Sequence, residues 1–156
     1  MEFVTHKDVH FGHPRAVVWA AMADVDSFKL WWPWLRTFDA RALATGDEWR
    51  CTVRPPLPYT VSFTIAMEEV VAEERIVARV RGDVAGAAEL TLFSVDDGCR
   101  VVVRSDLAPQ SRFLRLLSTT LSPVARFGHD WILTTGAAQF ALRALPATAG
   151  APDTTT

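Results

Sequence analysis

Residues 111–145, near the C-terminus, most constrain how this chain can fold. They predict a long helix that is interrupted near Pro123, because proline lacks the N–H that a helix interior requires. After Pro123 apolar residues recur at helical spacing, which predicts that one side of the helix faces a core. A helix of about 22 residues spans roughly 33 Å, enough to cross a small sheet. The predicted inward stripe consists of Val124, Phe127, Trp131, Thr135, Ala138 and Leu142.

The residues ahead of this helix predict an antiparallel sheet with one solvent-facing side. A first strand over residues 3–11 is followed by two short helices, over residues 15–23 and near residues 28–32. From Trp34 onward apolar residues alternate with a period of two, which is typical of half-buried strands. The further strands are expected over residues 35–43, 48–54, 59–67, 75–82, 87–95 and 100–107. The predicted fold is therefore α+β, with a curved antiparallel sheet of about seven strands wrapped around the long C-terminal helix.

Charge and hydropathy exclude several classes of partner. The net charge of −2 argues against nucleic-acid binding, which requires a basic face. No run of about 18 apolar residues is present, so no membrane span is expected. The N-terminal residues carry no apolar run typical of a secretory signal, and two cysteines without metal spacing suggest reduced thiols. A cytoplasmic protein is the resulting expectation.

The length of 156 residues suits one domain. We expect that domain to occupy residues 1–145. Residues 146–156 are small, polar and contain proline, and they predict a disordered tail.

A space between the sheet and the long helix is expected because small residues are interleaved with bulky ones on the helix. Tyr59, at the start of an inward row, is either a hydrogen-bond donor to a ligand or a core ring with its hydroxyl at the rim. The segment over residues 31–34 is a cavity lid, a contact surface for a partner, or a seal that holds the short helices on the sheet. The predicted ligand-binding residues are Trp34, Trp49, Val53, Tyr59, Phe63, Ala78, Val80, Leu90, Val101, Val103, Ser105, Phe127 and Trp131.

Titratable residues offer little catalytic chemistry. Asp130 is the one weak catalytic candidate, on the flank of the Trp131 stripe, whereas His129 is expected to point away from it, since neighbours in a helix diverge by about 100°. The favoured interpretation pairs Asp130 with Arg126 one turn earlier. His6, Asp8 and His10 share one strand face, which we interpret as solvated and not as a metal site. Neither a metal nor another cofactor is predicted.

Five short motifs, in order, resemble a known superfamily. They are HPRAVVW over residues 13–19 with Asp24, WWPW over 31–34, GDVAG over 82–86, DGCRV over 97–101 and HDW over 129–131. The chain is similar to the START-like (helix-grip) superfamily, the SRPBCC group, and in particular its polyketide cyclase/dehydrase and lipid-transport family. The resemblance implies an incomplete barrel around the last helix with an apolar cavity. Ala88, Leu90, Cys99 and Ser105 depart from the usual pattern, which implies a reshaped cavity.

The resulting hypothesis is a protein that binds an apolar small molecule, such as a polyketide, lipid or quinone, without catalysis. One alternative is a polyketide cyclase or aromatase that works by orienting its substrate and excluding water. A second alternative is a protein-interaction module that presents the tryptophan-rich helices. We expect a monomer or a weak homodimer.

Overall fold

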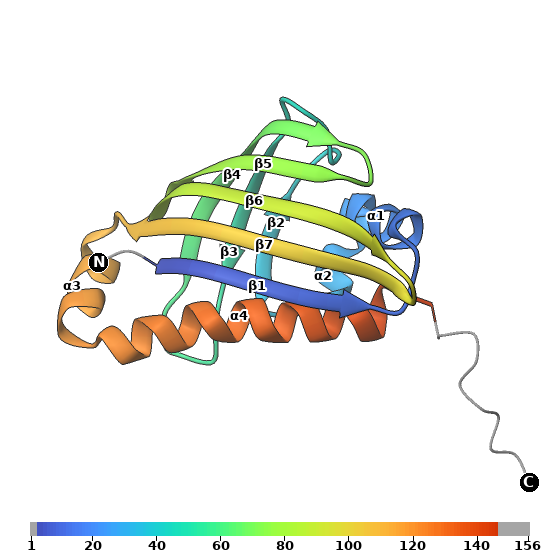
Figure 1. Ribbon diagram of the computed structural model, residues 1–156. Coiled ribbons are helices and arrows are strands. Elements are labelled where there is room, and N and C mark those ends of the chain that lie inside the picture. Colours follow the sequence, from blue (N-terminus) through green and yellow to red (C-terminus); the bar gives the residue numbers. More distant parts are fainter. Residues whose placement is uncertain (1–2, 147–156) are drawn as a thin grey trace, which may run out of the picture.

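Seven antiparallel strands form one curled sheet in the computed structural model, which describes residues 3–146 (Figure 1). The order across the sheet is β1-β7-β6-β5-β4-β3-β2, so the first strand pairs with the last and lies at one edge. The strands are β1 (Phe3–Phe11), β2 (Leu35–Asp39), β3 (Glu48–Val53), β4 (Val61–Val71), β5 (Arg75–Gly82), β6 (Val84–Val95) and β7 (Gly98–Pro109). The α+β half-barrel predicted from the sequence is thereby confirmed.

Helices lie at both ends of the sheet and along its open side (Figure 1). They are α1 (Arg15–Ala23), the short 3₁₀ helix η1 (Val25–Ser27), α2 (Phe28–Trp31), α3 (Arg112–Thr120) and α4 (Ser122–Arg143). The predicted interruption of the C-terminal helix is confirmed, because α3 ends before Leu121 and Pro123 lies in the first turn of α4. No helix within residues 3–146 is long and apolar enough to cross a membrane. The predicted tail falls almost wholly on residues 147–156, outside the described part of the chain.

The strand register gives the sheet one inward face, as alternation predicts. Trp49 pairs with Ile65, which in turn pairs with Val80. Leu90 pairs with Val103 in the other half of the sheet. Because residues paired directly across neighbouring strands lie on the same face, these apolar rows all point toward α4.

Helix α4 closes the half-barrel by bonding to both sides of its opening. On the β1 side, Lys7 donates from Nζ to Thr134 Oγ1 at 2.8 Å. On the other side, the Trp32 indole donates to the Gly136 carbonyl oxygen at 2.9 Å. Helix α4 therefore links the two sides of the opening and forms a closing wall of the interior.

The inward face of α4 differs from the predicted stripe. Phe127 is 51% exposed, and Ala138 and Leu142 are also exposed, so their predicted inward orientation is wrong. The rings of Tyr59 and Trp34 pack against this side of the helix, where Gly128 and Gly136 leave room for them. The residues of α4 that are buried or partly buried on this side are Ala125, Gly128, His129, Ile132, Gly136 and Phe140.

Candidate functional site

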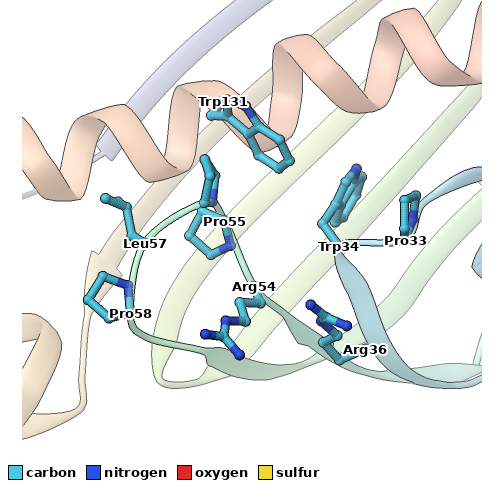
Figure 2. A pocket seen from close by; sticks show the side chains of 9 residues that line it. Pro33, Trp34, Arg36, Arg54, Pro55, Leu57, Pro58 and Trp131 are labelled. Carbon is cyan, nitrogen blue, oxygen red and sulfur yellow. The ribbon is translucent and has the colours of Figure 1, made fainter.

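A pocket of about 640 Å³ opens between α4 and the connections around β2 and β3 (Figure 2). This volume lies within the range of small-molecule sites, which is about 300–1,000 Å³. Trp131 projects from α4 toward Pro55, and Trp34 stands opposite, across the space from this pair (Figure 2). The lining residues are Pro33, Trp34, Arg36, Arg54, Pro55, Pro56, Leu57, Pro58 and Trp131.

Trp34 is fixed in place by α4. Its indole N–H donates to Gln139 Oε1 at 2.8 Å, and its ring lies 5.4 Å from the ring of Trp32. A Cβ on Gly136 would come within 3.1 Å of the Trp34 ring, so the bare glycine backbone lets this ring rest on the helix. The pocket wall is consequently held by α4 and not by the sheet alone.

Tyr59 packs against α4 two turns before this contact. A Cβ on Gly128 would collide with the Tyr59 hydroxyl oxygen and come within 3.3 Å of Pro55. The other side of the Tyr59 ring meets Phe113 of α3, at 5.7 Å between ring centres. The two glycines therefore mark two places where aromatic residues touch α4, and the pocket lies along the same side of the helix.

The rim of the pocket is cationic. Arg36 and Arg54 both line it, both are exposed, and neither forms an ion pair with any residue in the range 3–146. Figure 2 shows their side chains together at the end of the pocket away from Trp131. Guanidinium groups bind carboxylates through paired hydrogen bonds. An open pocket with aromatic and proline walls and a cationic rim fits a ligand that has a flat or chain-like apolar body and an acidic end.

The structure separates the sequence-predicted site residues into two sets on the concave face. Trp49, near α2, packs against Phe28 and Phe38, and its indole donates to the Ala42 carbonyl oxygen at 2.9 Å. A ligand would reach it only after these rings moved. The buried set is Trp49, Val53, Ala78, Val80 and Val101.

The other predicted residues keep some contact with solvent although they face α4. Phe63, Leu90, Val103 and Ser105 are all partly exposed. Of the predicted residues, Trp34 and Trp131 line the pocket, Tyr59 lies beside it, and Phe127 points to solvent. These four side chains are therefore less tightly enclosed than the buried set.

His129 and Asp130 have the opposite orientations from those predicted. The His129 side chain is 20% exposed and the Asp130 side chain is 73% exposed, so Asp130 does not lean toward the interior. Asp130 also lies beside His129, with Oδ1 3.7 Å from Nδ1, and no ion pair with Arg126 occurs within the described residues. The rotation of α4 that exposes Phe127 accounts for both corrections.

His129 places a titratable side chain on the inner side of α4, where the sequence predicted little catalytic chemistry. Its Nδ1 lies 3.5 Å from Thr5 Oγ1 on the inward face of β1, and Lys7 lies on the same strand face. Burial lowers the pKa of His129 below 6.5, although the neighbouring Asp130 carboxylate opposes this shift. The neutral imidazole is thus the favoured form in the folded protein near neutral pH.

This depressed pKa predicts a loss of stability in mild acid. Below about pH 6.5 the unfolded chain binds a proton on His129 that the folded chain does not, so the free energy of unfolding falls as pH falls. His129→Gln should flatten this dependence between about pH 7.5 and 5.5 in urea titrations. His6→Gln, at an exposed position, is the control and should leave the slope unchanged. Equal slopes for all three proteins would contradict the assignment.

Cysteine and metal chemistry receive no support from the geometry. Burial raises the pKa of Cys51 to about 12, so its thiolate does not form near neutral pH. Cys99 is also buried and unpaired. Asp8 and His10 bond to Arg100 and Asp97 on the outer face, as expected for a solvated strand surface. Within residues 3–146 no three His, Cys, Asp or Glu side chains are grouped to hold a metal ion.

Sequence reasoning missed most of the rim. The predicted site residues include neither Arg36 nor Arg54 nor the proline-rich loop over residues 55–58, all of which line the pocket. One signal was available, since a rigid Pro-Pro-Leu-Pro segment between two strands holds a fixed shape at low entropic cost. The sequence did not indicate that this loop lies against α4.

Comparisons with known proteins agree with the geometry. The profile of the family described as Activator of Hsp90 ATPase homolog 1-like protein matches residues 12–116. No curated protein matches significantly.

Among solved structures, a START superfamily protein from Mycobacterium smegmatis superposes with a TM-score of 0.69 at 11% identity, covering 90% of this chain and 96% of that one. The Zhui aromatase/cyclase from Streptomyces sp. R1128 superposes with a TM-score of 0.67 at 17% identity, covering 91% and 92%. These two likenesses establish the fold.

Proposed function

Because the chain belongs to the Activator of Hsp90 ATPase homolog 1-like family, within the START-like superfamily, we propose that it binds an apolar small molecule between α4 and the sheet. The observation that carries this proposal is the pocket between Trp34 and Trp131, which opens to solvent on the side where α4 meets the proline-rich loop. The superfamily predicted from the sequence motifs is confirmed by the family profile and by the structural likeness. The family profile and the structural likeness concern the superfamily, and the class of ligand is inferred from the pocket.

The site supports a ligand with an apolar body and an acidic end. Two indoles and four prolines provide flat apolar surface, which suits rings and acyl chains. The arginines at the rim would meet a carboxylate without displacing an existing ion-pair partner within the described residues. Phe63, Leu90 and Val103 do not line this pocket, so the contact surface for the ligand is the one between Trp34, Trp131 and the proline-rich loop.

We expect a matched pair of probes to reveal this preference. Titration with 2-naphthoate should change the tryptophan emission, because Trp34 and Trp131 line the pocket. The uncharged 2-naphthalenemethanol should bind more weakly, by roughly tenfold, since a charged hydrogen bond contributes about 1.5–3 kcal/mol and part of it is offset by desolvation. Isothermal titration calorimetry provides an independent affinity. Binding of neither probe, nor of an acyl pair such as dodecanoate and dodecanol, would refute the binding proposal.

Cyclase or aromatase activity remains a second candidate because of one observation. His129 places a largely neutral imidazole on the α4 side of the interior, with Thr5 beside it. A neutral imidazole is a competent general base near neutral pH. The aromatase/cyclase with a similar fold is consistent with this candidate, at 17% identity. A reaction would then depend on His129, and not on Asp130 as the sequence suggested.

A further inference from the structure

A second surface, separate from the pocket, lies at the end of the molecule formed by α3 and the start of α4 (Figure 1). Four large apolar side chains are exposed there, by 51–62% each. We call this surface the α3 apex and define its apolar part as Phe113, Leu116, Leu121 and Phe127. Such a cluster is unusual on one end of a soluble domain and marks an interaction surface.

Helix α3 has two apolar sides with different roles. Leu114 and Leu117 are buried and pack with Ala125 of α4, so they attach the helix to the body of the protein. Phe113 and Leu116 are three residues apart, which places them as neighbours on the helix surface, and both are exposed. Leu116 therefore lies on the side of α3 that faces away from α4, and Phe113 combines a contact with Tyr59 with an exposed side chain.

The charge around these side chains is of one sign. Arg112, Arg115 and Arg126 are exposed, and the sequence contains no acidic residue between Asp106 and Asp130. None of the three arginines forms an ion pair within residues 3–146. This segment contrasts with the chain as a whole, whose net charge is −2.

Asp83 is the acidic residue whose backbone lies at the start of α3. Its carbonyl oxygen accepts hydrogen bonds from the N–H groups of Gln110 and Ser111. Its carboxylate instead accepts from the Ser62 N–H at 2.8 Å, so one of its oxygens is already engaged. The positive charge of the apex is thus not offset by an ion pair with Asp83.

We propose that the α3 apex docks on an anionic lipid surface. Exposed leucine and phenylalanine side chains would enter the boundary between headgroups and acyl chains, while the arginines meet the lipid phosphates. A second copy of the chain fits less well, because a symmetric dimer through this end would bring six arginines together without acidic partners. The proposal does not depend on the pocket. Phe113 nevertheless touches Tyr59, beside the pocket loop, so docking would hold that opening near the membrane.

Co-sedimentation with lipid vesicles tests this proposal. The wild-type protein should bind vesicles of phosphatidylcholine and phosphatidylglycerol, bind vesicles of phosphatidylcholine alone much more weakly, and dissociate as salt is raised. Leu116→Ser should lower the partition coefficient by about tenfold, because an apolar side chain no longer enters the bilayer. The double variant Arg112→Gln, Arg126→Gln should lower it by roughly 30-fold, at about 1 kcal/mol per charge.

Matched controls come from elsewhere on the same protein. Leu142→Ser changes a leucine that is 82% exposed at the other end of α4, and Arg50→Gln removes an exposed arginine from β3. Both should bind as the wild type does, and circular dichroism should show all variants folded. Binding to neither type of vesicle, or equal losses in the controls and the apex variants, would overturn the proposal. So would a dimer, detected by light scattering, that Leu116→Ser dissolves.

Discussion

Phe140→Ala is expected to lower the free energy of unfolding by about 3–5 kcal/mol, the usual range for removing a buried phenylalanine. Phe140 is 5% exposed, and its ring meets Phe11 of β1 and Trp31 of α2, at 5.4 and 5.7 Å between ring centres. It is thus the point where α4, the edge strand and the short helices come together. The midpoint of thermal unfolding should fall by roughly 6–20 °C.

The control for this variant lies two residues further along the same helix. Leu142 is 82% exposed, so Leu142→Ala should change the free energy of unfolding by less than about 0.5 kcal/mol. Urea denaturation followed by circular dichroism measures both variants on the same scale. Should Phe140→Ala prove too unstable to purify, Phe140→Leu retains much of the apolar volume and should show a smaller loss. Equal stability of the Phe140→Ala and Leu142→Ala proteins would show that the aromatic junction does not hold α4.

The sheet was predictable because its signal is local. Alternation along residues 61–67 and 76–80 assigns an inward face without knowledge of the partner strands, and the register confirms that face. The break before Pro123 was equally local, because proline restricts the helix that contains it. A half-barrel around a long helix therefore followed from patterns that span fewer than about ten residues each.

The orientation of α4 was not predictable in the same way. A helix stripe is judged by the size and hydrophobicity of its own residues, which favoured Phe127 and Leu142 as inward positions. In the folded chain, Trp34 and Tyr59 arrive from segments distant in sequence and fill the space against Gly136 and Gly128. Small residues then face inward because their partners are large. Only the tertiary contacts contain that information.

The same contacts explain which parts of the site were missed. Trp34 and Trp131 were identified because large rings suit apolar pockets, and they do line one. Arg36 and Arg54 follow buried residues in alternating strands, a pattern that predicts exposed side chains and does not mark a binding site. Both are exposed, but the loop over residues 55–58 folds back toward α4 and turns this surface into a rim. The site thus lies at the edge of the sheet and not only beneath it.

Trp131→Ala is expected to weaken ligand binding by about 30-fold. If a ligand covers about 80 Å² of the indole, the loss at 25 cal/mol per Å² is about 2 kcal/mol. Asp130→Asn is the matched control on the adjacent residue, and it should leave the affinity unchanged because its side chain is 73% exposed. Calorimetric titration with 2-naphthoate compares the two. Equal affinities for both variants would place the ligand away from Trp131.

His129→Gln extends this comparison from binding to catalysis. Glutamine retains hydrogen-bonding capacity near Thr5 but cannot accept a proton near neutral pH. If the protein only binds, the variant should keep its affinity and no product should form from a polyketone in any of the proteins. If it is a cyclase that uses His129 as a base, the wild type and Asp130→Asn should both form product, and His129→Gln should bind the polyketone but lose about 100-fold or more in turnover. Because Trp131 and His129 lie two residues apart on α4, affinity and turnover would then respond to different side chains of one helix. Any product formed by the wild-type protein would be enough to overturn the preference for a binder.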